Sequence, residues 1–195
     1  MNATHREIDE GLVQRAQSGD RTGLRLLVQE VYPLVHRWAL VRTGDPSEAD
    51  DLTQDVMIQM IRRLGSYQGN ARFSTWLYSV TRNAATDRQR KSGRQARALE
   101  DAGLSMAVTP DSPPGPDTLA ERASLSGVVQ TFLRELPVRQ REVLDLVDLQ
   151  GLSSPEAAER LGIEPVSVRA SLFKARRALR RRILEGHPHL AEDFS

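Results

Sequence analysis

Two helical segments joined by a very short turn constrain the fold of this chain more than any other feature of its sequence. The first runs from Leu152 to Gly162, and the second runs from Val166 to Ile183. In the first segment, Pro155 suits the opening turn of a helix, and either Ser153 or Ser154 can cap it. The second segment contains no acidic residue. Its basic residues are Arg169, Lys174, Arg176, Arg177, Arg180, Arg181 and Arg182.

This pattern predicts a helix-turn-helix, whose second helix enters the major groove of DNA. Leu172, Ala175 and Leu179 form its inward stripe, and Gly162 permits the turn between the helices. Residues near the start of the second helix lie closest to the bases, and later ones lie closest to phosphates. A helical hairpin with a solvated basic face is the alternative. The predicted DNA contacts are Ser167, Arg169, Ala170, Ser171, Lys174, Arg176, Arg177 and Arg180.

The formal net charge of the 195 residues is only +1, so a chain that binds nucleic acid must separate its charges. Acidic residues outnumber basic ones in residues 8–60, and the balance inverts in residues 61–98. Cysteine is absent, which excludes disulfides, thiolate zinc sites and cysteine nucleophiles. The N-terminus lacks a signal-peptide core, and no apolar run approaches the roughly 20 residues that span a bilayer. We therefore expect a cytoplasmic protein without membrane insertion.

Apolar residues recur at helical spacing along most of the chain, and strand alternation is nowhere sustained. The expected fold is all-α, with two small helical domains joined by a flexible linker, and with the helix-turn-helix in the C-terminal domain. Proline and glycine gather between the two domains. Pro33 lies inside a helical pattern, so a helix either kinks or begins near it. The expected boundaries are residues 8–92, 93–117 for the linker, and 118–185.

A predicted helix that starts at Asp45-Pro46 carries acidic residues along one face. Asp51, Asp55 and Gln59 follow each other at four-residue spacing, opposite an apolar stripe that begins at Leu52. Like charges at this spacing weaken a helix, so a basic partner from outside would relieve them. A solvated face and a divalent metal site are alternatives. The metal site is the weaker one, because no histidine joins the cluster and the carboxylates form a stripe.

Three motifs together resemble the extracytoplasmic-function class of bacterial RNA polymerase sigma factors, in the sigma-70 family. They are the segment Glu48–Val56, the segment Phe73–Asn83, and the stretch from Leu136-Pro137 through Leu179. They occur in the family's order and spacing, and the similarity covers about residues 9–183. The resemblance implies a factor that binds core RNA polymerase, directs promoter-specific initiation and has no active site of its own.

The family pattern also implies roles for individual residues of the first domain. The acidic face would bind polymerase through Asp50, Asp51, Gln54 and Asp55. The loop at residues 65–72 and the helix after it would recognise and open the minus-ten element. The residues implied there are Tyr67, Asn70, Arg82, Asn83, Arg88, Arg90 and Lys91. Tyr67 and Phe73 could either pack or stack on an unpaired base.

The resemblance further implies promoter DNA and an anti-sigma factor as partners, without a cofactor or a metal, although no residue identifies the anti-sigma factor. Two other interpretations stay open at the level of sequence. One is a stand-alone helix-turn-helix regulator, which leaves the first domain unexplained. The other is a metal-dependent enzyme that uses Asp50, Asp51 and Asp55.

Overall fold

The computed structural model describes residues 8–101 and 133–186, and these residues form helices without any strand. The N-terminal half contains α1 (Glu10–Gln17), α2 (Arg21–Thr43), α3 (Pro46–Arg63), the 3-10 turn η1 (Leu64–Ser66) and α4 (Phe73–Asp101). The C-terminal half contains α7 (Val138–Leu144), the π-helical turn η2 (Asp145–Leu149), α8 (Ser154–Leu161) and α9 (Pro165–Gly186). The expected all-α fold is confirmed.

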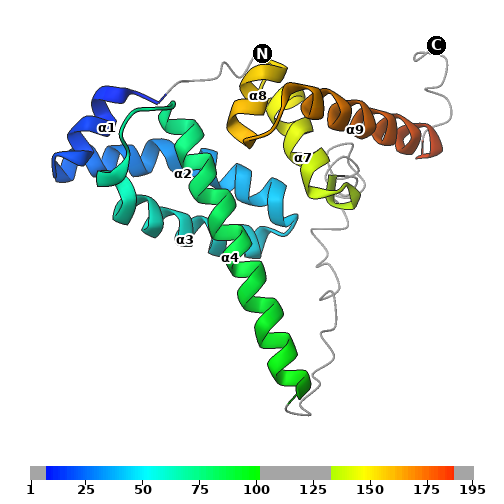
Figure 1. Cartoon of the computed structure of the whole chain (residues 1–195), viewed down its shortest axis with the longest axis horizontal. Coiled ribbons are helices and arrows are strands. Elements are labelled where there is room, and N and C mark those ends of the chain that lie inside the picture. The colour runs from blue at the N-terminus through cyan, green and yellow to red at the C-terminus, as the bar shows by residue number, and fades with distance from the viewer. Residues whose placement is uncertain (1–7, 102–132, 187–195) are drawn as a thin grey trace.

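Helix α2 is the long element against which the other helices of the N-terminal half pack (Figure 1). Asp20 caps its start by accepting a bond from the amide of Thr22, at 2.8 Å. Gly44 ends it with φ +76°, a conformation that glycine adopts without strain. Pro33 lies inside this helix, so α2 neither begins nor ends at the proline.

The core of the N-terminal half is built from apolar stripes on three helices. Leu27, Val31 and Val35 of α2 are completely buried. They pack with a stripe on α3 and a stripe on α4. The buried members of these two stripes are Leu52, Val56, Met60, Leu77, Val80 and Ala84. The spacing of the apolar residues on α3 was sufficient to predict which of its faces is buried.

Helix α4 extends well beyond the body of the molecule, as Figure 1 shows in green. The expected linker starts at residue 93, but the helix continues to Asp101. Gly93 interrupts the sequence pattern without interrupting the helix, because the residues after it are mostly good helix formers such as Gln95 and Ala98. The remainder of the expected linker, and residues 118–132 of the expected C-terminal domain, fall outside the described residues.

The two halves pack against each other, with α2 against α7 and α4 against α8 (Figure 1). Arg37 of α2 forms a salt bridge with Asp145 at 2.6 Å, and Arg42 forms one with Glu142, also at 2.6 Å. The side chains of Asp145 and Glu142 are only 5% and 4% exposed. Two helical domains were expected, but this polar interface between them was not.

Arginine side chains also join α4 and α8 across this interface. Arg82 donates a hydrogen bond to the carbonyl oxygen of Leu161 at 2.7 Å. Arg160 donates to Ser74 Oγ at 2.9 Å, and its guanidinium lies 5.7 Å from the ring centroid of Trp38. Desolvation lowers the pKa of Arg160, as expected for a charge held between two packed domains.

Candidate functional site

The acidic face of α3 is exposed, on the side of the helix opposite its buried apolar stripe. Asp45 accepts a bond from the amide of Glu48 at 2.9 Å, and Pro46 occupies the first turn. The apolar stripe of Leu52, Val56 and Met60 is buried in the core. The predicted polymerase-binding residues therefore lie on the other side. Asp50, Asp51 and Gln54 are exposed, and Asp55 is partly exposed.

Two exposed isoleucines continue the same face of α3 toward its C-terminal end. Ile58 is 49% exposed and Ile61 is 45% exposed. They follow Gln54 at spacings of four and seven residues, so all three side chains share one side of the helix. Neither residue is among the expected contacts. Their place in the sequence, outside the apolar stripe that begins at Leu52 and beside a polar patch, is a signal that could have identified them.

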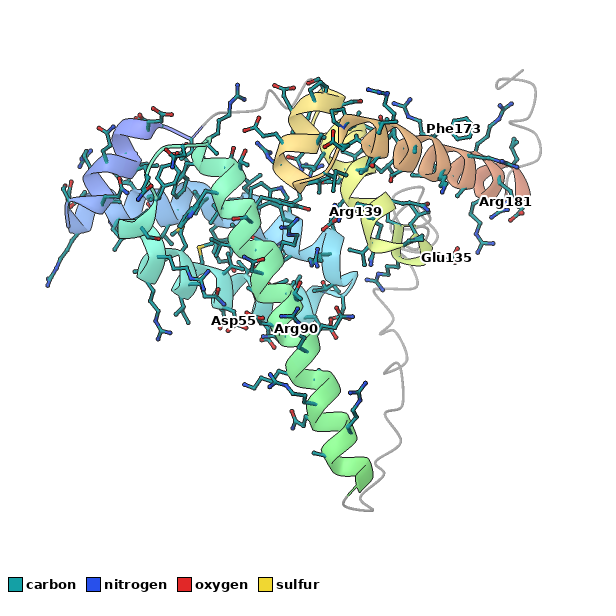
Figure 2. All side chains as sticks on the ribbon, viewed as in Figure 1. Asp55, Arg90, Glu135, Arg139, Phe173 and Arg181 are labelled. Carbon is teal, nitrogen blue, oxygen red and sulfur yellow. The ribbon has the colours of Figure 1, made fainter. Side chains whose placement is uncertain are left out.

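The acidic face already has a basic partner within the chain, which is Arg88 of α4. Arg88 Nη1 lies 2.7 Å from Asp55 Oδ2, and Nη2 lies 3.1 Å from Asp51 Oδ2. Asp50 is separately paired with His36 at 3.0 Å. Figure 2 labels Asp55 and Arg90 close to the place where α3 and α4 cross. The family resemblance implies DNA binding for Arg88 and polymerase binding for the carboxylates, whereas the structure pairs Arg88 with two of these carboxylates.

The loop between η1 and α4 is held by contacts to its backbone and by aromatic packing. Gln17 donates bonds to the carbonyl oxygens of Leu64 and Tyr67, at 2.9 and 2.8 Å. The ring of Tyr67 packs edge-on against Phe73, with ring centroids 5.2 Å apart, and its hydroxyl donates to Ala71 O at 2.7 Å. Phe73 is 3% exposed, so it packs in this conformation instead of facing solvent.

Several of the predicted minus-ten residues nevertheless face solvent. Asn70 lies in the exposed part of the loop, and Asn83 lies exposed on α4. Arg90 and Lys91 are exposed further along α4. Arg82 is different, because its guanidinium is used in the contact with Leu161 between the two halves. The predicted set is thus divided into exposed residues and residues with partners inside the protein.

The C-terminal helices form the predicted helix-turn-helix. Ser153, not Ser154, caps α8, in a capping box with Glu156 in which Glu156 Oε2 lies 2.9 Å from the amide nitrogen of Ser153. Gly162 makes the turn with φ +63°. Val168, Leu172 and Ala175 of α9 are buried against the helices beneath. The short turn and the inward stripe predicted this arrangement.

Helix α9 presents nearly all of its predicted DNA contacts to solvent. Ser171 is partly buried, and Arg176 forms a salt bridge with Asp148 in which Nη2 lies 2.5 Å from Oδ1. The exposed predicted residues are Ser167, Arg169, Ala170, Lys174, Arg176, Arg177 and Arg180. A helical hairpin with a solvated basic face would not explain why apolar side chains are also exposed on this surface of α9.

Phe173 is the residue on this surface that the sequence analysis missed. Its side chain is 68% exposed, and Figure 2 shows it on the side of α9 that faces away from α7. Val166, two turns earlier on the same side, is 61% exposed. Ala170 lies between them and completes an apolar strip. Apolar side chains of this kind contact the methyl group of thymine in the major groove.

The described residues contain no group of three or more histidine, cysteine, aspartate or glutamate side chains arranged to hold a metal ion. The carboxylates of α3 lie along the helix, and two of them are paired with an arginine. Within residues 8–101 and 133–186, no helix is both long and apolar enough to cross a membrane.

Comparison with known proteins identifies the family. Residues 27–95 match the family described as Sigma-70 region 2, and residues 126–179 match Sigma-70, region 4. The chain is 32% identical over 177 residues to ECF RNA polymerase sigma factor SigM of Mycobacterium tuberculosis, covering 91% of this chain and 85% of SigM. It is 29% identical to RNA polymerase sigma-H factor of Pseudomonas aeruginosa, covering 89% of this chain and 92% of that protein.

Two solved structures share the fold. The sigma factor RpoE of Bartonella quintana, in complex with the anti-sigma factor NepR, has a TM-score of 0.62 and 22% identity. That match covers 82% of this chain and 95% of RpoE. CnrH, in complex with the cytosolic domain of CnrY, has a TM-score of 0.62 and 24% identity, covering 92% of this chain and 98% of CnrH.

A chain that matches both regions of the sigma-70 family, and that aligns over most of its length with ECF sigma factors, is a sigma factor. The protein belongs to the sigma-70 family, in its extracytoplasmic-function (ECF) class. It is a non-enzymatic factor for transcription initiation. The match to Sigma-70 region 2 explains the first domain, which a stand-alone helix-turn-helix regulator would leave unexplained.

Proposed function

We propose that the chain binds core RNA polymerase through the exposed face of α3. The contact uses Asp50, Asp51, Gln54 and Asp55, and it continues onto Ile58 and Ile61. Carboxylates at the edge of such a patch select a basic partner, and the two isoleucines supply apolar area that the partner removes from water. The observation that supports this proposal most is that the face is exposed over both its acidic and its apolar parts.

The minus-ten element is recognised by the loop before α4 and by the basic face of α4. Asn70 and Asn83 present hydrogen-bonding groups to bases, and Arg90 and Lys91 bind phosphates. Tyr67, Arg82 and Arg88 belong to the same proposed set, but each has a partner within the protein. Their contribution to DNA binding requires those contacts to be exchanged when the promoter is engaged.

The minus-thirty-five element is read by α9. The polar and small residues near its start face the bases, and its later basic residues bind phosphates. Phe173 and Val166 add apolar contacts to this surface, so thymine methyl groups contribute to its preference. The bases close to the start of α9 meet Ser167, Arg169, Ala170 and Ser171. The phosphates meet Lys174, Arg176, Arg177 and Arg180.

The domains proposed for these two tasks are residues 8–92 and residues 118–185, joined by residues 93–117. The first nine residues assigned to the linker, 93–101, continue α4. The two halves also pack together through Arg37 and Arg42. Promoter recognition by both halves at once then depends on the distance that the connection allows between them.

The protein acts in the cytoplasm, where core polymerase and promoter DNA are found. An anti-sigma factor is a further proposed partner. This proposal is supported by the relationship to ECF sigma factors and by a solved sigma factor of the same fold that was determined with the anti-sigma factor NepR.

Sequencing the 5′ ends of transcripts made in vitro tests the proposed function as a whole. Core polymerase is supplied with this chain and with genomic DNA fragments. We expect transcripts that start downstream of a shared pair of promoter elements, and we expect none with core polymerase alone. Random starts, or starts unchanged by addition of the chain, would contradict the proposal.

A further inference from the structure

Arg88 is placed between the two surfaces that the proposed function uses. Its guanidinium spans one turn of α3, with Nη1 2.7 Å from Asp55 Oδ2 and Nη2 3.1 Å from Asp51 Oδ2. Its own helix, α4, carries the exposed basic residues Arg90 and Lys91. Lys91 follows Arg88 by three residues, so the two side chains are neighbours on α4. One side chain therefore adjoins both the carboxylates and the basic face.

The pairing relieves a repulsion within the acidic face. Asp51 and Asp55 lie four residues apart on α3, where like charges destabilise a helix. The sequence suggested that an outside cation would relieve this repulsion, but Arg88 does so from within the chain. The bond to Asp55, followed by the bond to Asp51, raises the pKa of Arg88, so its guanidinium remains charged at any pH at which the protein functions.

The pairing is also easy to exchange, because all three side chains are in contact with solvent. The exposed fractions are 39% for Arg88, 62% for Asp51 and 44% for Asp55. Ion pairs with this exposure contribute little net stability, since water and salt compete for both partners. A basic partner that binds the carboxylates with more contacts can displace Arg88 without unfolding anything.

We propose that Arg88 exchanges partners during assembly. In the free chain it neutralises Asp51 and Asp55, and when basic residues of polymerase bind these carboxylates, Arg88 is released and binds promoter phosphate beside Lys91. This inference rests on the proposed roles of α3 and α4. It adds a physical link between them, because binding at one surface makes a cation available at the other.

The proposed exchange predicts how removal of Arg88 changes the affinity for polymerase. The direction of that change distinguishes the exchange from a simpler role, in which Arg88 only positions the carboxylates. If Arg88 competes with polymerase for the carboxylates, its removal leaves polymerase binding unchanged or makes it tighter. If Arg88 only holds the carboxylates in position for polymerase, its removal weakens that binding. In both cases the acidic face remains on α3, so the direction of the change reports the role.

The experiment compares Arg88→Gln with Arg90→Gln in the full chain. Arg90 is a matched control, because it lies on the same helix and its nearest acidic partner is Asp87, at 3.8 Å, instead of the carboxylates of α3. The affinity for core polymerase is measured by fluorescence titration. The affinity of each holoenzyme for a promoter fragment with an unpaired minus-ten region is measured over a series of salt concentrations.

For Arg88→Gln we expect core affinity between unchanged and about fivefold tighter, which is the range for loss of an exposed competing ion pair. We expect weaker promoter binding by the holoenzyme, with a salt-dependence slope reduced by roughly one, as for the loss of one phosphate contact. Arg90→Gln should lower promoter binding while core affinity stays unchanged. Arg88→Lys, which keeps a charge, should retain more promoter affinity than Arg88→Gln.

Weaker core binding by Arg88→Gln, with a circular dichroism spectrum like that of the unchanged protein, would overturn the exchange in favour of positioning. Unchanged promoter binding and salt slope would overturn it as well. The double variant Asp51→Asn plus Asp55→Asn tests separately whether these carboxylates bind polymerase. If this double variant binds core polymerase normally, Asp51 and Asp55 are not part of the polymerase contact. If it loses binding while Arg88→Gln also weakens binding, only the exchange fails.

Discussion

Arg42 of α2 and Glu142 of α7 form a salt bridge that joins the two halves of the protein, with Arg42 Nη1 2.6 Å from Glu142 Oε1. The Glu142 side chain is 4% exposed and that of Arg42 is 20% exposed, so both charges are largely removed from water. Tyr78 of α4 lies beside them, and desolvation together with Glu142 raises its pKa well above the ordinary value. The contact between the two halves therefore depends on the charges of Arg42 and Glu142.

Replacement of Glu142 by alanine should open the interface between the halves. Removal of one partner from a buried pair leaves the other charge uncompensated, at a cost of about 3–5 kcal/mol. Small-angle scattering should therefore show a larger radius of gyration for Glu142→Ala. Arg15→Ala, which removes an exposed pair with Asp20 inside the N-terminal half, is the control and should leave the radius unchanged. An unchanged radius for Glu142→Ala would show that this pair does not hold the halves together.

Replacement of Asp145 by asparagine should stabilise the folded chain at neutral pH, because Arg37 is 39% exposed and stays hydrated, and because the asparagine Oδ1 can still accept its bonds. Desolvation raises the pKa of Asp145 despite its bonds to Arg37, so the folded protein disfavours the charged carboxylate. A raised acid pKa means that the group's contribution is favourable below its unfolded pKa and is lost as pH rises through the folded value. Asparagine avoids this loss. The gain in thermal midpoint should therefore be present at pH 7 and should disappear as pH falls toward the ordinary value of 3.8. A lower midpoint at pH 7 would contradict this.

Phe173→Ala should weaken promoter binding without destabilising the protein. The ring is 68% exposed, so its removal creates no cavity, while it takes an apolar contact away from the DNA-facing side of α9. Binding of the holoenzyme to promoter DNA should weaken by about fivefold, or roughly 1 kcal/mol. The thermal midpoint should not change. Leu149→Ala removes another exposed apolar side chain, 51% exposed on η2, and should leave promoter binding intact. Equal effects of the two variants would refute a specific role for Phe173.

Ser153→Ala should destabilise the helix-turn-helix. Ser153 caps α8 in a reciprocal arrangement with Glu156, and loss of such a cap costs about 0.5–2 kcal/mol. Chemical denaturation monitored by circular dichroism measures the change in free energy of unfolding. Ser154, the first residue of α8, does not provide the cap, so Ser154→Ala should be close to neutral. A larger loss for Ser154→Ala than for Ser153→Ala would contradict the assignment of the cap.

Elements defined by local periodicity could be predicted from the sequence, because their determinants lie within a few residues of one another. The start of α3 at Asp45-Pro46 and its inward stripe follow from spacing alone. The turn at Gly162 and the inward face of α9 follow in the same way. The exposed apolar surfaces of Ile58 and Phe173 were not predicted, because charged residues dominate the sequence of those two helix faces.

Contacts between distant segments could not be predicted in this way. The family resemblance implies a DNA contact for Arg88, whereas its pairing with Asp51 and Asp55 depends on how α3 crosses α4. Arg82 was assigned in the same way, and it bonds to Leu161, which lies in the other half of the chain. The partner of a basic side chain is the acceptor that tertiary packing places within hydrogen-bond distance. The local sequence pattern does not specify which acceptor that is.

The central claim is that negative charge on α3 recruits polymerase, and the most direct measurement is the affinity of core polymerase for a chain with Asp51→Arg and Asp55→Arg. The account predicts that this variant fails to co-purify with core polymerase while its circular dichroism spectrum remains helical. Glu30→Arg, a charge reversal at a partly exposed position on α2, should co-purify normally. Normal co-purification of the Asp51→Arg and Asp55→Arg variant would contradict the account.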